Sequence, residues 1–402
     1  MTEKRKSPAL RFRGYTDDWE QRKFNDIATR ESAVRKSSPD CPSIEYEDVV
    51  AEAGILNKDI RLKDSEKNGI IFDGSQVLYG KLRPYLHNWH NPDFEGVAVG
   101  DWWVLKPIHV DKSFLYRLIQ TQKFDDIANQ SSGSKMPRAD WNLVSNSEFS
   151  IPPLIDEQVR IGTYFNDLDN LITLHQRKLE KLKLVKKSML EKMFPKNGSS
   201  VPEIRFKGFT DDWEQRKLSH FLDVSSEKNT DNLYTKDDVL SVSGDFGVIN
   251  QIEFQGRSFA GASVSNYGVV HTGDVVYTKS PLKANPYGII KANKGKTGIV
   301  SVLYGVYHTR ENANADFIQM YFEQDTRLNN YLRPLVNKGA KNTLLISDTD
   351  ALEGEVCLAP TFDEQKTIGQ FFDTLDNLIT LHQRKVEKLK ILKKSMLEKM
   401  FV

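Results

Sequence analysis

One long segment with regularly spaced apolar residues occurs twice in this chain, and the repeat limits the folds that it can adopt. Residues 168–194 read LDNLITLHQRKLEKLKLVKKSMLEKMF, and residues 375–401 read LDNLITLHQRKVEKLKILKKSMLEKMF. Apolar residues in each copy alternate three and four positions apart, which is the heptad spacing of a coiled coil. A stripe this narrow needs a partner helix, so we predict that the two copies pack on each other.

The predicted seam between the copies contains apolar residues and one histidine from each copy. Its members are Leu168, Ile172, His175, Leu179, Leu182 and Met189, with Leu375, Ile379, His382, Val386, Leu389 and Met396. A histidine on a seam can set the helix register or bind a metal ion. The histidines and cysteines of this chain form no metal-binding spacing, so we interpret His175 and His382 as register-setting core residues.

A second repeat marks the start of each half. Residues 10–24 read LRFRGYTDDWEQRKF, and residues 204–218 read IRFKGFTDDWEQRKL. Each half thus opens with TDDWEQRK and closes with the long helix. We interpret Trp19 and Trp213, inside this repeat, as anchors where a globular domain meets the helices.

Between these repeats the halves differ in sequence but agree in the order of their expected elements. The first half has strand-like segments at 72–86 and 96–107 and helical spacing over 113–130, and the second half follows the same order. We therefore predict the α+β class, with two mixed globes separated by long helices that form an antiparallel coiled coil with pseudo-two-fold symmetry. The expected segments are 1–150, 151–196, 197–357 and 358–402.

Composition excludes several classes of protein. The 402 residues carry 56 basic and 55 acidic side chains, so the net charge of +1 indicates neither nucleic acid nor membrane. Two cysteines, with no apolar signal region or membrane-spanning run, predict a cytoplasmic protein. The basic run at 177–196 is either a solvated helix face or a phosphate contact.

The sequence contains fragments that resemble catalytic motifs, but each fragment lacks a required residue or lies at the start of a long helix. The GKT at 295–297 lacks the earlier glycine of a phosphate-binding loop, and Asn285-Pro286-Tyr287 lacks the second proline of an adenine methyltransferase motif. The Glu-Gln pairs at 157–158 and 364–365 open the long helices, so they do not mark a nuclease. We expect no active site, metal or cofactor in this chain.

Binding motifs are more informative, because cations and aromatic rings beside glycine suit contacts with bases and phosphates. The predicted DNA-binding residues of the first half are Tyr79, Lys81, Arg83, Tyr85, Ser132, Gly133, Ser134, Lys135 and Arg138. Those of the second half are Tyr277, Lys279, Ser280, Lys283, Lys338, Gly339, Lys341 and Asn342. The two sets fall at corresponding places in the halves.

With these segments, the chain resembles the specificity subunits of type I restriction-modification systems. The resemblance covers nearly the whole chain and rests on the helix repeat, the TDDWEQRK segments, IPPLIDEQ with LAPTFDEQ, and YGKLRPYL. Lys81, Arg83 and the loop at 133–138 match the family's DNA-facing patterns. The second half departs from them, because YTKSPL stands where the first half has YGKLRP.

The resemblance implies two target-recognition domains, each reading half of a bipartite site in double-stranded DNA. It also implies two methyltransferase (modification) subunits around the helices and restriction subunits that complete the complex. S-adenosylmethionine, ATP and Mg²⁺ would belong to those partners and not to this chain. The alternatives from the residues alone are a scaffold whose globes bind proteins and an independent DNA-modifying enzyme, for which the motifs are missing.

Overall fold

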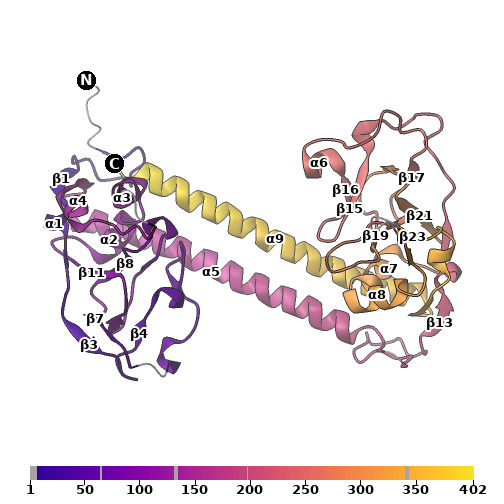
Figure 1. Cartoon of the computed structure of the whole chain (residues 1–402), viewed down its shortest axis with the longest axis horizontal. Coiled ribbons are helices and arrows are strands. Elements are labelled where there is room, and N and C mark those ends of the chain that lie inside the picture. Colours follow the sequence, from indigo (N-terminus) through magenta and orange to yellow (C-terminus); the bar gives the residue numbers. More distant parts are fainter. Residues whose placement is uncertain (1–6, 64–65, 131–134, 197, 340–343) are drawn as a thin grey trace. The chain divides into compact units, whose positions relative to one another are not determined.

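The computed structural model of the chain describes residues 7–63, 66–130, 135–196, 198–339 and 344–402. Its packing divides the chain into two compact units (Figure 1). The first unit comprises Met1–Arg177 with His382–Val402, and the second comprises Lys178–Leu381. Each long helix therefore begins in one unit and ends in the other. The segments expected from the sequence follow the order of the chain, whereas these units follow its packing.

The globe of the first unit contains two four-stranded sheets. One has the order β2 (Ala28–Arg30), β11 (Trp102–Pro107), β8 (Val77–Gly80) and β9 (Trp89–His90). The other has the order β3 (Val34–Lys36), β7 (Asn68–Phe72), β10 (Gly96–Ala98) and β4 (Ser43–Ile44). Alternate residues of β8 face two hydrophobic clusters, with Val77 and Tyr79 in one and Leu78 in the other.

The globe of the second unit repeats the first of these sheets with unrelated sequence. Its strands have the order β14 (Leu222–Val224), β21 (Tyr304–Thr309), β18 (Val275–Thr278) and β19 (Ile289–Ala292), all antiparallel as in the first globe. Smaller pairs complete it: β15 (Leu240–Ser243) with β16 (Gly247–Asn250), and β17 (Gly268–Val270) with β20 (Gly298–Val300). The predicted α+β class is confirmed in both globes.

Several segments that the sequence pattern predicts as one helix or one strand each form two elements in the structure. The predicted helix at 113–130 is α2 (Lys112–Leu118) followed by α3 (Gln122–Ala128), because Thr121 caps α3 by accepting a hydrogen bond from the Phe124 N–H at 3.3 Å. The segment at 96–107 breaks between β10 and β11 near Gly100, whose φ is +99°. The second globe likewise has α7 (Ala315–Phe322) and α8 (Asp325–Leu332).

The repeated EQRK letters form a strand that closes each globe. β1 (Glu20–Lys23) pairs with β12 (Glu148–Ile151), and β13 (Glu214–Lys217) pairs with β24 (Glu355–Leu358). β12 and β24 lead directly into the long helices. The opening repeat is therefore conserved between the halves because it pairs with the chain at the start of each helix.

Trp19 and Trp213, just before these strands, anchor the helix ends as predicted. Trp19 is 3% exposed and its ring lies 6.1 Å from that of Phe401, at the end of the second long helix. Trp213, also 3% exposed, lies 5.9 Å from Phe194 near the end of the first. Each tryptophan thus joins its globe to the helix that the other half of the chain begins.

The Glu-Gln pairs of the long helices have a structural role. The buried Glu157 carboxylate accepts two hydrogen bonds from Arg11, at 2.6 and 2.8 Å. Gln158 accepts from the Asp111 N–H at 2.8 Å and donates to the Pro152 carbonyl at 2.9 Å. In the second half, Glu364 and Gln365 make the matching bonds to Arg205, Asn314 and Ala359. These contacts tie each helix start to its globe, which excludes a nuclease role for the pairs.

The long helices α5 (Ile155–Lys192) and α9 (Phe362–Met400) pack antiparallel. In the first unit, Leu168 near the start of α5 shares a core with Met400 at the end of α9. In the second unit the roles reverse, and Met193 and Phe194 near the end of α5 share a core with Leu375. Every predicted seam residue is buried or half-buried, so the coiled coil is confirmed.

Equivalent residues of the two repeats form the polar contacts along the seam. His175 and His382 meet each other, with 2.9 Å between their Nδ1 atoms, so one ring donates and the other accepts. In the first unit the Lys393 ammonium lies 2.7 Å from the Asp169 carboxylate. The copy of this pair in the second unit is Lys186 with Asp376, also at 2.7 Å. One register of the antiparallel helices satisfies all of these contacts, so they select it.

We predict that Asp169→Ala destabilises the first unit by about 3 kcal/mol, as expected when one partner of a buried ion pair is removed. Asp169 also accepts from Arg117 at 2.7 Å, and the Arg117 and Lys393 side chains are only 1% and 13% exposed. The value lies at the low end of the usual range because Asn166 still accepts from Arg117. Urea unfolding measures the loss, with Asp167→Ala at an exposed position of the same helix as the control. Equal stability of the two variants would contradict this role for Asp169.

Candidate nucleic-acid interface

The predicted tyrosines at the ends of the central strands belong to the core. Tyr79 is 2% exposed and its ring lies 5.6 Å from that of Trp103 and 5.1 Å from that of Phe124. Tyr277 is fully buried, and its hydroxyl donates to the Tyr287 carbonyl at 2.7 Å. The prediction that these two side chains contact DNA is therefore wrong. Strand alternation turns them toward the helices, whereas the lysine two positions later lies beyond the strand.

The structure brings the two predicted segments of the first globe together. The Arg83 N–H donates to the Pro137 carbonyl at 2.7 Å, and the Ala139 N–H donates to the Lys81 carbonyl at 2.8 Å. Asp101 links their side chains, accepting from Arg138 at 3.0 and 3.1 Å and lying 3.6 Å from the Lys81 ammonium. The hydrogen bond from Arg138 lowers the pKa of Asp101, so its carboxylate stays ionised at neutral pH.

Arg83 is held in an unusual backbone conformation within this cluster. Its φ is +48°, in the left-handed region that few residues other than glycine adopt. The buried Arg83 Nε has no hydrogen-bond partner within the described part of the chain. Strain of this kind is found at functional sites, where surrounding contacts hold it in place. The neighbouring Tyr85 is 53% exposed. Arg83 and Tyr85 therefore remain candidates for contact with a ligand.

The remaining residues predicted for the first globe lie beside this cluster in the sequence. Lys135 is exposed, and the structure gives it no ion pair with any described residue. Ser132, Gly133 and Ser134 lie outside the described residues. The surface at the end of β8 therefore contains Lys81, Arg83, Tyr85, Lys135 and Arg138.

A related cluster follows the equivalent strand of the second globe. Lys279 follows β18 as Lys81 follows β8, and its ammonium lies 2.8 Å from the Asp348 carboxylate. Lys338 lies over the Tyr287 ring, 5.0 Å from its centroid, and the Tyr287 carbonyl accepts the hydrogen bond from Tyr277, so Tyr287 links the two predicted segments. The other predicted residues lie close by in the sequence.

Among those other residues, Ser280 and Gly339 are half-buried and Lys283 is exposed, while Lys341 and Asn342 lie outside the described residues. Pattern reasoning missed Asp101 and Asp348, the acidic partners of the strand-end lysines. The register of Trp102 opposite Gly80 places Asp101 opposite Lys81, so strand pairing could have found it. Asp348 lies far from Lys279 in the sequence and has no comparable signal.

Asn285, which begins the methyltransferase-like tripeptide, is a structural residue. It is 9% exposed, and its side-chain amide donates to Asp325 at 2.8 Å. Within the described residues, no group of three or more His, Cys, Asp or Glu side chains is arranged to hold a metal ion. The candidate site is therefore a set of cations and planar groups suited to binding.

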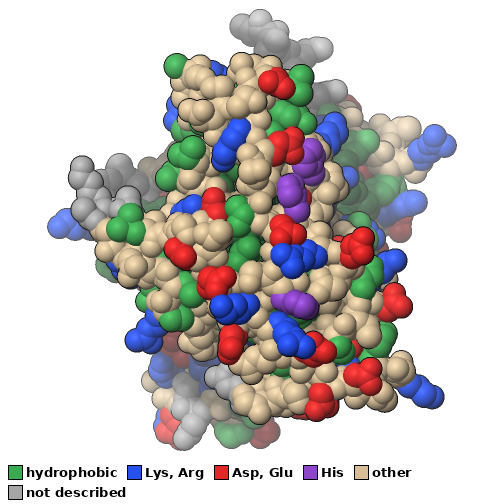
Figure 2. Space-filling view, turned by 90° about the vertical axis from the view of Figure 1, so that its right-hand side faces the viewer, with side chains coloured by type: hydrophobic (Ala, Val, Ile, Leu, Met, Phe, Trp, Pro, Cys, Tyr) green, Lys and Arg blue, Asp and Glu red, His purple; other side chains and the backbone are tan. Residues whose placement is uncertain are grey.

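Charge on the surface is local. Figure 2 shows acidic and basic side chains interspersed over one face of the second unit. This pattern agrees with the net charge of +1. No broad field of one charge sign covers that face (Figure 2). Among the described residues, no helix combines the length and hydropathy that crossing a bilayer requires.

Comparison with known proteins identifies the relatives of this chain. Residues 16–184 match the family described as the type I restriction modification DNA specificity domain. The putative type I restriction enzyme MjaX specificity subunit of Methanocaldococcus jannaschii is 22% identical over 95% of this chain and 92% of its own length. The MjaVIII specificity subunit of the same organism is 26% identical over 43% of this chain and 39% of its own length.

A solved structure extends the comparison to the fold. The crystal structure of the type I restriction-modification S subunit from M. genitalium superposes with a TM-score of 0.62 at 12% sequence identity. The match covers 98% of this chain and 99% of the other. The chain therefore shares the fold of that subunit over nearly its whole length, although the two sequences have little identity.

We predict that Asp101→Ala loosens the contact between the two segments of the first cluster. Because the Asp101–Arg138 ion pair is exposed to solvent, its loss should have a modest effect, with amide exchange up to roughly fivefold faster. Hydrogen exchange at the Arg83 and Ala139 amides measures the effect, and Asp18→Ala provides an exposed control. Unchanged exchange at both amides would show that the backbone alone holds the segments.

Proposed function

The chain is a type I restriction-modification specificity subunit with the family's DNA specificity domain over residues 16–184, and from this premise we propose that each globe reads one half of a bipartite DNA target. The subunit recognises DNA sequence and is not catalytic. It directs adenine methylation and restriction by the partner subunits of the complex.

The observation that carries this proposal is the recurrence of one cation cluster in two globes of unrelated sequence. Equivalent strands, in sheets with the same strand order, are followed by Lys81 in one globe and by Lys279 in the other. Each lysine pairs with a carboxylate, Asp101 and Asp348 respectively. The frame around them is nearly identical in the two halves, whereas the globes differ. Two globes with different surfaces, held by nearly identical repeats, suit a DNA target made of two unlike half-sites.

The chemistry of the clusters suits contacts with double-stranded DNA. Lysine and arginine bind phosphate oxygens and fix the position of a protein on the duplex, while a forked guanidinium can also read the edge of a guanine. The carboxylates of Asp101 and Asp348 hold neighbouring cations in place, which reduces the side-chain freedom lost on binding. In this proposal Arg83, with its strained backbone, contacts the bases of the first half-site.

The exposed face of the helix pair supports a second part of the proposal, which concerns the partner subunits. Besides the seam, both helices expose large apolar side chains at the same repeat positions. These are Leu171, Leu174, Leu184 and Val185 on α5, and Leu378, Leu381, Ile391 and Leu392 on α9. We propose that two methyltransferase subunits bind here, because two copies of one surface suit two copies of one partner.

The first unit also has a cavity of about 560 Å³ beside these positions. Its lining includes Ile172 of α5 and Ile391 and Leu397 of α9, together with the turn at 50–55. A partner side chain inserted there would contact the helix pair and the first globe together. S-adenosylmethionine would bind to the methyltransferase subunits in this proposal, and ATP and Mg²⁺ to the restriction subunits.

Independent reading predicts that replacing residues 25–150 with the corresponding globe of a relative changes one half of the methylated sequence only. The strand at Glu148–Ile151 pairs with the opening repeat, so the junctions must preserve that pairing. Methylome sequencing of cells that express the native or the exchanged protein with its partners measures the result. A simultaneous change of both half-sites would contradict independent reading, and the absence of any sequence-specific methylation with the native chain would overturn the proposed function.

For the partner surface, we predict that Leu174→Ser combined with Leu381→Ser weakens association with the methyltransferase subunits by roughly tenfold or more. The two side chains are 61% and 48% exposed, so the variant should fold normally. Co-purification and analytical ultracentrifugation measure the association. Leu303→Ser, at a 56% exposed position of the second globe, is the control. Association equal to that of the control would remove this face from the interface.

A further inference from the structure

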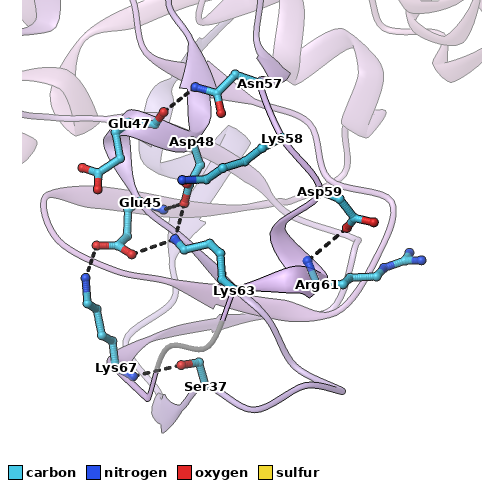
Figure 3. Close-up of polar contacts among 10 residues, drawn as sticks. All are labelled: Ser37, Glu45, Glu47, Asp48, Asn57, Lys58, Asp59, Arg61, Lys63 and Lys67. Carbon is cyan, nitrogen blue, oxygen red and sulfur yellow. Dashed lines mark hydrogen bonds and ion pairs between the residues drawn. The ribbon is translucent and has the colours of Figure 1, made fainter.

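A surface loop of the first globe is held by several hydrogen bonds and ion pairs although much of it is exposed. It follows β6 (Ile55–Leu56) and contains the short helix η2 (Ile60–Leu62). The Asn57 N–H donates to the Asp48 carbonyl at 2.9 Å, and the Asn57 side chain donates to the Glu47 carbonyl at 2.5 Å. The Asp59 carboxylate then caps the turn by accepting from the Arg61 N–H at 3.0 Å (Figure 3).

A buried carboxylate lies at the centre of these contacts. Asp48, on η1 (Tyr46–Asp48), has a fully buried side chain that lies 2.8 Å from the Lys58 ammonium and 2.6 Å from the Lys63 ammonium (Figure 3). Glu45 extends the network to Lys63 at 2.7 Å and to Lys67 at 2.5 Å. Burial opposes the charge of Asp48, but the two lysines outweigh it and lower its pKa.

Such a network contributes little net stability, because desolvation offsets most of the attraction between buried charges. Its main physical effect is to fix geometry. Here it fixes a loop that has no large apolar core of its own, since Ile60 is the buried residue of the turn. Asp48 is therefore best understood as a positioning residue for what the turn presents.

The turn presents one cation and one apolar side chain to solvent. Leu62 is 84% exposed, and Arg61 is exposed and forms no ion pair with any described residue. Figure 3 shows the Arg61 side chain extending away from the carboxylates of Glu45 and Asp48. Lys58 and Lys67 are half-exposed, but each pairs with a carboxylate, of Asp48 and Glu45 respectively. Arg61 is therefore the cation of the turn that no described carboxylate pairs.

The same short helix η1 also belongs to the strand-end cluster. The Tyr46 hydroxyl donates to the Asp101 carbonyl at 2.8 Å and accepts from the Leu82 N–H at 2.9 Å. Its ring lies 4.7 Å from that of Trp102. Tyr46 therefore contacts the candidate DNA site, and Asp48, two residues later, holds the exposed turn. The helix η1 thus connects the strand-end cluster to the η2 turn.

We propose that the η2 turn is a second DNA-contacting element of the first globe, in which Arg61 binds a phosphate or a base edge and Leu62 packs against bases in a groove. Arginine and an adjacent apolar side chain on a narrow turn are a combination that proteins insert into DNA grooves. A single exposed leucine offers too little apolar area for a protein interface, whereas the guanidinium of Arg61 beside it suits a phosphate or a base edge. This inference rests on the proposed function and extends it to residues outside the strand-end clusters.

The test uses the native complex with its methyltransferase subunits and a duplex that carries the site mapped by methylome sequencing. Fluorescence anisotropy at several salt concentrations gives the affinity and its salt dependence. Arg61→Ala should bind about tenfold more weakly. If Arg61 contacts a phosphate, the salt slope should fall by about one and all sequences should be affected alike. If it contacts a base, the methylated motif should relax in one half-site.

Leu62→Ala should weaken binding to the mapped duplex severalfold and leave binding to a scrambled duplex unchanged. The matched controls are Arg13→Ala and Leu154→Ala, at exposed positions of the same unit outside the loop. If Arg61→Ala and Leu62→Ala both bind like these controls while the native complex remains site-specific, the inference is wrong and the proposed function stands. Loss of subunit assembly in place of DNA affinity would assign the turn to a protein contact and would also overturn it.

Asp48→Asn tests the positioning role through coupling. It should weaken DNA binding when Arg61 is present and have little further effect in the Arg61→Ala background, because Asp48 acts through that side chain. If Asp48→Asn fails to fold, Lys58→Ala provides the same test from the partly exposed end of the network. Equal losses in the two backgrounds would contradict positioning. A native complex without site-specific binding would overturn the proposed function and this inference together.

Discussion

The antiparallel pairing of two copies of the same helix is the constraint on which the rest of the structure depends. Each helix begins beside the globe that precedes it in the sequence and ends in the core of the other unit. Phe194 packs against Trp213, and Phe401 packs against Trp19. Neither globe has a complete core without a helix end that the other half of the chain supplies. Substitutions at the end of either helix are therefore expected to disturb the core of the globe that the other half of the chain supplies.

Polar residues on the seam make this pairing specific. An apolar stripe would allow the helices to slide by a heptad, but a buried lysine must meet a carboxylate. Lys393 meets Asp169 and Lys186 meets Asp376, so each repeat supplies both members of the pair. His175 and His382, which share one position of the repeat, meet each other. The frame can thus present two globes with the same local geometry while their surfaces differ.

The clusters proposed for DNA recognition lie on loops at the ends of equivalent strands. The strand order of the central sheet is the same in both globes, and Lys81 and Lys279 leave it at the same place. The second sheet of the first globe and the paired strands of the second globe have no such correspondence. Residues of these loops can therefore change without disturbing the packing of the sheet that supports them. The η2 turn of the first globe is held by ion pairs to the buried Asp48 carboxylate and by one buried apolar residue, Ile60.

The sequence by itself determined the helix repeat, its seam, the α+β class and the segments that contain the strand-end cations, because these depend on periodicity and local residue types. Only the tertiary structure decided which side chains face outward: Tyr79 and Tyr277 are buried because a strand alternates its faces and helices cover one of them. The tertiary structure also determined which carboxylates pair with the strand-end lysines, since Asp348 is distant from Lys279 in the sequence. It showed as well that segments with a continuous apolar pattern form two short helices. The type of a side chain and its neighbours in the sequence predict whether it is able to bind a ligand, but packing determines whether that side chain is exposed.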